Sequence, residues 1–163
     1  MPNKVIIIMG VSGSGKTTIG KMLAEKTRFE FYDADNFHPK ENIEKMQAGI
    51  PLTDEDRWPW LDNMNNFAKE KIKTGNVIVT CSALKEIYRL RLCKGIEISC
   101  RWIFLKGTYD MILQRMQQRK EHYMPASLLQ SQFDALEEPT GAITEDISQS
   151  PEIIVQRIIK AIY

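Results

Sequence analysis

The sequence has almost no excess of charge of either sign. Its 22 lysines and arginines are balanced by 21 aspartates and glutamates, which gives a formal net charge of +1. Proteins that bind nucleic acid or anionic membranes through their overall charge carry a clear basic excess. The balance therefore predicts neither a nucleic-acid partner nor a membrane partner.

Long apolar runs and abundant cysteines are missing as well. No apolar run approaches the roughly 18 residues needed to span a bilayer, and the run at residues 5–9 leaves no room for a signal peptide before it. The three cysteines, Cys81, Cys93 and Cys100, are an odd number without metal-ligand spacing. They favour a reduced compartment inside the cell, so we expect a cytoplasmic protein.

One stretch carries the most specific signal in the chain. Residues 10–17 fit the phosphate-binding pattern of glycine, any four residues, then Gly-Lys-Ser/Thr. Its members are Gly10, Val11, Ser12, Gly13, Ser14, Gly15, Lys16 and Thr17. An apolar strand pattern precedes this P-loop and a helical pattern follows it, which argues against a plain Gly-Ser turn. We expect Lys16 to reach the outer phosphates of a nucleotide and Thr17 to ligate Mg²⁺.

Strand and helix patterns alternate along all 163 residues. This alternation predicts one α/β domain over residues 1–163, with a five-stranded parallel sheet flanked by helices. Strands are expected at residues 5–9, 30–35, 77–80, 102–105 and 142–147. In such folds, ligands bind at the carboxyl ends of the strands.

Two carboxylates, Asp33 and Asp35, close the second expected strand. The strand at 77–80 ends in Cys81 rather than in the aspartate that holds Mg²⁺ in switches and motors. Two residues apart on a strand, the acids are expected on one side, where one binds Mg²⁺ through water and the other accepts a proton. The alternative is a pair of solvated acids.

Four polar residues extend the candidate site. The guanidinium fork of Arg57 matches a carboxylate and predicts an acidic substrate, unless Arg57 pairs with its acidic neighbours at 54–56. His38, before a proline, is either a turn residue or a ligand. Lys85 and Arg89 lie four residues apart on an expected helix, where a solvated basic face is the alternative.

A polar, basic stretch interrupts the helical pattern after residue 118. With Arg115 and Arg119 leading into it, residues 115–126 suit a mobile lid that closes positive charge over the nucleotide phosphates. An ordinary basic helix end is the alternative.

Several motifs together resemble the gluconokinases, within the small-molecule P-loop kinases. They are Asp-x-Asp-x-x-His-Pro at 33–39, Asp-Arg-x-Pro-Trp-Leu at 56–61, Cys-Ser-Ala-Leu-Lys at 81–85 and Leu-Leu-Gln-Ser-Gln-Phe at 128–133. The resemblance covers nearly the whole chain. Thr17 stands where serine is commoner, which keeps the hydroxyl, and residues 143–147 match loosely.

The resemblance implies a P-loop kinase that uses ATP and Mg²⁺ to phosphorylate the 6-hydroxyl of D-gluconate in sugar-acid catabolism. It also implies a cytoplasmic enzyme that is commonly a homodimer. The catalytic residues are then Lys16, Asp35 and Arg119, and the nucleotide contacts are the P-loop, Arg115 and Arg119. The metal contacts are Thr17 and Asp33, and the gluconate contacts are Asp35, His38, Arg57, Lys85, Arg89 and Gln132.

Two other functions stay open on the sequence alone. One is a P-loop kinase with another small acceptor, such as shikimate or a nucleoside monophosphate. The other is a nucleotide-dependent regulatory switch that binds a partner protein, which the missing metal-binding aspartate after the strand at 77–80 disfavours.

Overall fold

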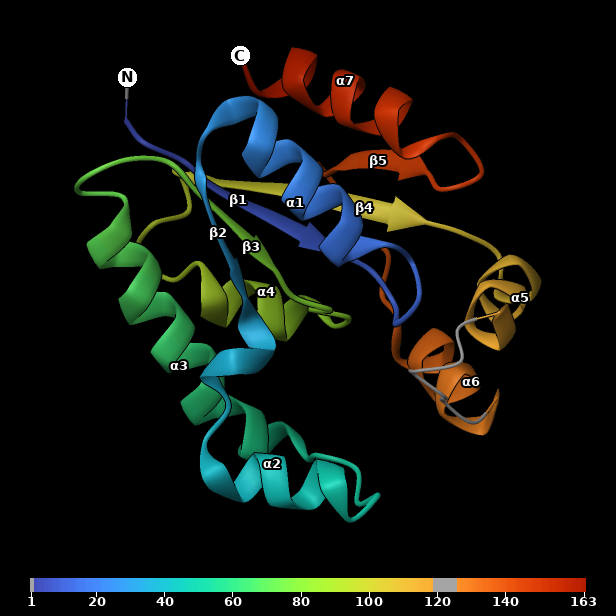
Figure 1. The fold of residues 1–163 in the computed structure, drawn as a ribbon. Helices are drawn as coiled ribbons and strands as arrows, with labels where there is room; N and C mark the ends of the chain where they lie inside the picture. The colour runs from blue at the N-terminus through green and yellow to red at the C-terminus, as the bar shows by residue number, and fades with distance from the viewer. Residues whose placement is uncertain (1, 119–125) are drawn as a thin grey trace.

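The computed structural model describes residues 2–118 and 126–163. Within these residues, five strands form one parallel sheet in the order β2-β3-β1-β4-β5 (Figure 1). The strands are β1 (Val5–Met9), β2 (Glu30–Asp33), β3 (Val77–Thr80), β4 (Cys100–Lys106) and β5 (Ile143–Asp146). The predicted α/β class and the parallel sheet are confirmed.

The helices occupy the segments between and after the strands. They are α1 (Lys16–Thr27), α2 (Lys40–Gln47), α3 (Asp54–Lys71), α4 (Glu86–Leu92), α5 (Tyr109–Gln118), α6 (Ala126–Ala135) and α7 (Pro151–Ile162), with a 3₁₀ helix η1 at Ala34–Phe37. A capping box formed by Thr53 and Asp56 starts α3, because each residue satisfies a backbone N–H of the other. Pro59 lies inside α3, and the helix continues through it. None of the helices in the described residues is long and apolar enough to cross a membrane.

The sheet separates two apolar layers. Alternate residues of a strand face opposite sides, so Ile7 of β1 packs with residues of α3 and α4, whereas Ile8 packs with residues of α1 and α7. Both isoleucines are fully buried. Figure 1 shows α3 and α4 on one side of the sheet and α1 on the other. This packing holds the central strands rigidly, and with them the loops that follow the strands.

The loops that carry the polar motifs leave the carboxyl ends of neighbouring strands. In the sheet, Asp33 of β2 is paired with Thr80 of β3, and Thr80 is paired with Ile8 of β1. The P-loop, η1 and the loop after β3 therefore begin at the same edge. Figure 1 shows α2 beyond the end of β2 and α5 and α6 beyond the end of β4, with the loop after β1 between them.

The structure corrects the expectation that both acids lie on the second strand. β2 ends at Asp33, and Asp35 belongs to η1. The Asp33 side chain causes the turn, because its Oδ1 accepts a hydrogen bond from the backbone N–H of Asp35 at 2.9 Å. Aspartate commonly redirects a chain in this way, by bonding to the backbone two residues ahead.

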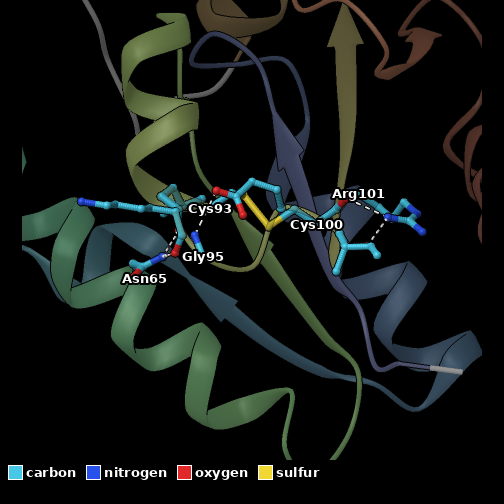
Figure 2. Close-up of a disulfide and its surroundings, with 9 residues drawn as sticks. Asn65, Cys93, Gly95, Cys100 and Arg101 are labelled. Carbon is cyan, nitrogen blue, oxygen red and sulfur yellow. Dashed lines mark hydrogen bonds between the residues drawn. A yellow bond between two sulfur atoms is a disulfide. The ribbon is translucent and has the colours of Figure 1, made fainter.

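The expectation of three reduced cysteines is also wrong in this structure. Cys93, just after α4, and Cys100, at the start of β4, form a disulfide (Figure 2). Cys81 stays free and buried. Burial raises the pKa of the Cys81 thiol to about 12, so this thiol is neutral and unreactive at neutral pH.

We expect reduction of the disulfide to lower the free energy of unfolding by about 2.5 kcal/mol, because the bond closes a short loop in the unfolded chain. The two cysteines are seven positions apart. Urea unfolding with and without dithiothreitol measures the change, and a Cys93→Ser, Cys100→Ser double variant should not respond to the reductant. Three titratable thiols in the denatured, unreduced protein, instead of one, would contradict the pairing.

Candidate active site

The P-loop forms the turn between β1 and α1. Gly13 and Gly15 adopt positive φ angles of 81° and 100°, a region that side chains disfavour, and Gly15 caps the start of α1. A Cβ on Gly13 would also lie 2.8 Å from the side chain of Met116 in α5. Both glycines are therefore required for the loop to turn its N–H groups toward an anion at the helix N-terminus.

Lys16 folds back over this loop. Its Nζ donates hydrogen bonds to the carbonyl oxygens of Gly10 and Val11, at 2.9 and 3.1 Å. Burial lowers the pKa of Lys16, while the charge of Asp35 acts against that shift. The ammonium group is thus held at the loop, and nearby carboxylates offset only part of the cost of burying its charge. This is expected of a group that binds phosphate.

A buried hydroxyl in the loop fits the same ligand. Ser14 Oγ is inaccessible and has no hydrogen-bond partner within residues 2–118 and 126–163. A buried polar atom without a partner is costly. Phosphate oxygens bound in the loop would satisfy it.

The electrostatics of Asp35 differ from those of a solvated acid. Its side chain is 79% exposed, yet the protein atoms around the carboxyl disfavour the charged form and raise its pKa, and the charge of Asp33 adds to the rise. Lys16 opposes both effects. Asp35 is therefore coupled to the P-loop lysine and has the raised basicity that suits a hydroxyl partner.

His38 is a buried, neutral ring beside Asp35. Its Nε2 lies 3.8 Å from Asp35 Oδ1, and its ring stacks on Trp60 with centroids 4.1 Å apart. Burial, with a smaller contribution from the charge of Arg57, lowers the pKa of His38 to about 4. His38 can therefore donate or accept a hydrogen bond at neutral pH without carrying charge.

Arg57 and Lys85 share one carboxylate. Asp54 Oδ1 lies 3.9 Å from Arg57 Nη1 and 3.6 Å from Lys85 Nζ, and it accepts a hydrogen bond from Tyr88. Both cations also lie over the Tyr88 ring. Arg57 thus pairs with an acidic neighbour, which was the alternative interpretation of its sequence context. Its Nη1 also donates a hydrogen bond to the Leu52 carbonyl. Two cations against one carboxylate still leave this cluster with net positive charge.

Arg89 has a different environment from Lys85. Arg89 is only 7% exposed, and its guanidinium donates to the backbone carbonyls of Ala83 and Glu137. It borders a pocket of about 260 Å³ beside α4 and the start of β4, which no residue of the P-loop or of η1 lines. These bonds give Arg89 a structural role, and its contact with a substrate stays a prediction.

Gln132 and Arg115 lie on the far side of the P-loop from η1, on α6 and α5. The Gln132 amide accepts from the Ser12 backbone N–H at 2.7 Å and donates to Ser12 Oγ at 3.0 Å. Arg115 donates to the carbonyl of Ile147, after β5. Gln132 therefore contacts the nucleotide loop itself. Arg119, with residues 120–125 of the expected lid, lies outside the described residues.

Sequence reasoning missed the residues that hold these groups in place. Asn42 bonds both His38 and the Asp56 carbonyl, and the Trp60 indole N–H donates to Ala34 at 2.7 Å. The only signal was that Trp60 falls in the motif at 56–61 and that Asn42 lies three positions after the motif at 33–39. The structure explains why these motifs occur together, because their side chains pack against each other.

The comparisons with known proteins agree with this geometry. A family model described as shikimate kinase matches residues 12–163. The chain is 41% identical to the gluconokinase of Arabidopsis thaliana, over 98% of this chain and 92% of that protein. It is 47% identical to the thermosensitive gluconokinase of Escherichia coli (strain K12), over 85% of this chain and 74% of that protein. The crystal structure of a gluconokinase from Sinorhizobium meliloti 1021 superposes with a TM-score of 0.85 at 40% identity, covering 99% and 96% of the two chains.

The chain belongs to the gluconokinase family. It is accordingly a P-loop kinase that uses ATP to phosphorylate a sugar acid. The gluconokinase family membership confirms the resemblance drawn from the motifs at 33–39, 56–61 and 81–85. The family does not by itself assign roles to single residues, so the roles of Asp33, Asp35 and the cationic cluster stay proposals.

Proposed function

We propose that this protein transfers the γ-phosphoryl group of ATP to the 6-hydroxyl of D-gluconate, giving 6-phosphogluconate and ADP. The observation that carries the proposal is the cluster of Arg57 and Lys85 around Asp54, close to His38 and Asp35. A carboxylate taken out of water needs cationic partners. The cluster's excess positive charge supplies them for the carboxylate of an open-chain sugar acid.

The other end of such a substrate would lie at Asp35. There the 6-hydroxyl attacks the γ-phosphorus, the bond from that phosphorus to the bridging oxygen breaks, and ADP leaves. The hydroxyl proton passes to Asp35. Because the transition state of phosphoryl transfer is loose, orientation of the hydroxyl and neutralisation of phosphate charge matter more than the strength of the base. Lys16 and the P-loop N–H groups provide the neutralisation.

Mg²⁺ is part of the proposed mechanism. Within the described residues, no cluster of three or more His, Cys, Asp or Glu residues could hold a metal by itself. That agrees with a kinase site, where Mg²⁺ keeps waters and binds substrate phosphates with one or two protein groups. Thr17 and Asp33 are the residues that would hold it. When bound, the ion would neutralise charge on the phosphate oxygens.

A panel of acceptors tests the function. With equal concentrations of gluconate, glucose and shikimate in a coupled ADP assay, we expect gluconate to be used far better than glucose, which offers the same terminal hydroxyl without a carboxylate. Equal turnover of glucose would refute the carboxylate anchor. A preference for shikimate would favour the other activity that the matching family model suggests.

Arg57→Lys tests the anchor within the same assay. An ammonium group cannot reproduce the guanidinium fork, so the KM for gluconate should rise about tenfold while the KM for ATP stays unchanged. Arg91→Lys is the matched control, because Arg91 also binds a carboxylate, Asp62, and lies over an aromatic ring, that of Trp58. Equal effects of both variants, or a change in thermal stability alone, would make Arg57 a structural partner of Asp54.

We also propose that the protein works in the cytoplasm, as a homodimer, without nucleic-acid or membrane partners. The near-neutral charge supports the absence of those partners. The cysteines do not support this location, because two of the three are paired. Light scattering coupled to gel filtration tests the dimer.

A further inference from the structure

The backbone carbonyl of Asp56 determines how the Asn42 side chain is oriented. Asn42 is 3% exposed, and its Nδ2 lies 2.8 Å from the Asp56 carbonyl oxygen. A carbonyl oxygen only accepts hydrogen bonds. The opposite amide orientation would place Asn42 Oδ1 against that oxygen with no proton between them. Nδ2 therefore faces Asp56.

The second proton of this amide determines the tautomer of His38. Asn42 Nδ2 lies 3.2 Å from His38 Nδ1. Because the amide nitrogen is a donor, Nδ1 must accept. The ring is neutral near pH 7, since its pKa is about 4, and a neutral imidazole carries one proton. That proton is therefore on Nε2.

The ring cannot easily turn to exchange its two nitrogens. It is 9% exposed and stacks on Trp60 with an interplanar angle of 19°. Trp60 is itself anchored by its indole N–H, which donates to the carbonyl of Ala34, next to Asp35. Nε2–H thus faces Asp35 Oδ1, 3.8 Å away.

We propose that Asn42 is a positioning residue for catalysis, which keeps His38 in the Nε2–H tautomer so that the ring presents a donor to the Asp35 carboxylate. The inference rests on the proposed function only in giving Asp35 the role of hydroxyl partner. The exposed Asp35 carboxylate needs to move by about 1 Å to reach hydrogen-bond distance. Bound to Nε2–H through one oxygen, Asp35 turns its other oxygen toward the acceptor hydroxyl.

The opposite tautomer would have the opposite effect. With the proton on Nδ1, the Nε2 lone pair would face a carboxylate oxygen, and neither atom could donate. Asp35 would be repelled from His38 and lose its orientation. The orientation of Asp35 therefore depends on a proton at His38 Nε2 more than on the charge of the ring.

Asn42→Asp reverses the donor at nearly constant volume. An aspartate at this position offers only acceptors to His38 Nδ1, so it draws the proton to Nδ1. Nitrogen-15 NMR of histidine-labelled protein reports the tautomer directly. The chain has only two histidines, and His38→Gln assigns the His38 signals by their loss. We expect Nε2–H in the wild type and a proton on Nδ1 in Asn42→Asp.

The kinetic effect should fall on kcat. We expect Asn42→Asp to lower kcat by about tenfold to a hundredfold, a part of what a general base contributes, with the KM values for gluconate and ATP nearly unchanged. Asn65→Asp is the matched control. Asn65 is also a buried asparagine of a helix, 7% exposed, and its amide donates to the carbonyls of Leu92 and Lys94 near the disulfide (Figure 2). It should lose stability without a change in kcat or in the His38 tautomer.

Each outcome bears on the inference. If Asn42→Asp does not fold, Asn42→Ala removes the donor and should give a mixture of tautomers. An unchanged Nε2–H tautomer in either folded variant overturns the proposal, as does an equal kcat loss in Asn65→Asp. If Asn42→Asp raises only the KM for gluconate, then His38 does not act by orienting Asp35. The NMR result needs no acceptor, so it stands or fails separately from gluconate phosphorylation.

Discussion

Lys16→Ala is expected to lower kcat by about three orders of magnitude, the loss found when a group that stabilises transition-state charge is removed. Among residues 2–118 and 126–163, the Lys16 ammonium donates hydrogen bonds only to the loop carbonyls of Gly10 and Val11. A phosphate bound in the loop would attract the Lys16 ammonium away from these carbonyls, and the ammonium would then neutralise part of the phosphate charge. A coupled assay at saturating ATP and gluconate measures the loss.

The fold should survive this change. Because the pKa of Lys16 is lowered in the folded protein, its charge opposes folding at neutral pH, and the alanine removes that cost. The melting temperature should therefore stay the same or rise slightly. Lys21→Ala, on the exposed side of the same helix, is the matched control and should keep full activity. Near-normal turnover of a folded Lys16→Ala protein would contradict the P-loop assignment.

Asp35→Asn is expected to lower kcat by about a hundredfold to ten-thousandfold, the contribution of general acid–base catalysis. The KM for ATP should change little, because the amide keeps the size of the carboxylate. Above its raised pKa, the charged Asp35 side chain opposes folding, so the neutral amide should not lower the melting temperature. Turnover that stays high would remove Asp35 as hydroxyl partner.

Asp33→Asn separates the roles of the two acids. An asparagine can still accept the hydrogen bond from the Asp35 backbone N–H that starts η1. If Asp33 binds Mg²⁺, the variant should need several times more Mg²⁺ for half-maximal rate, and Asp35→Asn should not. A higher Mg²⁺ requirement in Asp35→Asn and not in Asp33→Asn would instead make Asp35 the metal-binding acid and Asp33 the hydroxyl partner.

Some features follow from the sequence because they are local. The P-loop is one continuous stretch between a strand and a helix, and its glycines have the positive φ angles that the pattern demands. The capping box joins Thr53 and Asp56, which are three positions apart. The apolar strands are buried on both faces, so their runs are continuous and easily recognised. These signals sufficed for the fold class and for the edge of the sheet that carries the site.

Other features depend on side-chain partners that the strand and helix patterns do not specify. Gln132 reaches Ser12 across 120 positions, a contact that the sequence pattern around Gln132 does not indicate. Asp35 leaves the strand because the Asp33 side chain, not the strand pattern, determines the turn there. Cys93 and Cys100 pair because α4 and β4 place their ends together.

The site shows this division most clearly. The sequence by itself predicted that the P-loop and Asp35 lie at one edge of a parallel sheet, and it offered His38 and Arg57 only as candidate residues. It could not determine that Asn42 donates to His38, because the orientation of that amide depends on a carbonyl of α3, 14 positions away. Only tertiary packing decides the partner of a side chain that is buried between two helices, and here that partner decides which nitrogen of His38 carries the proton.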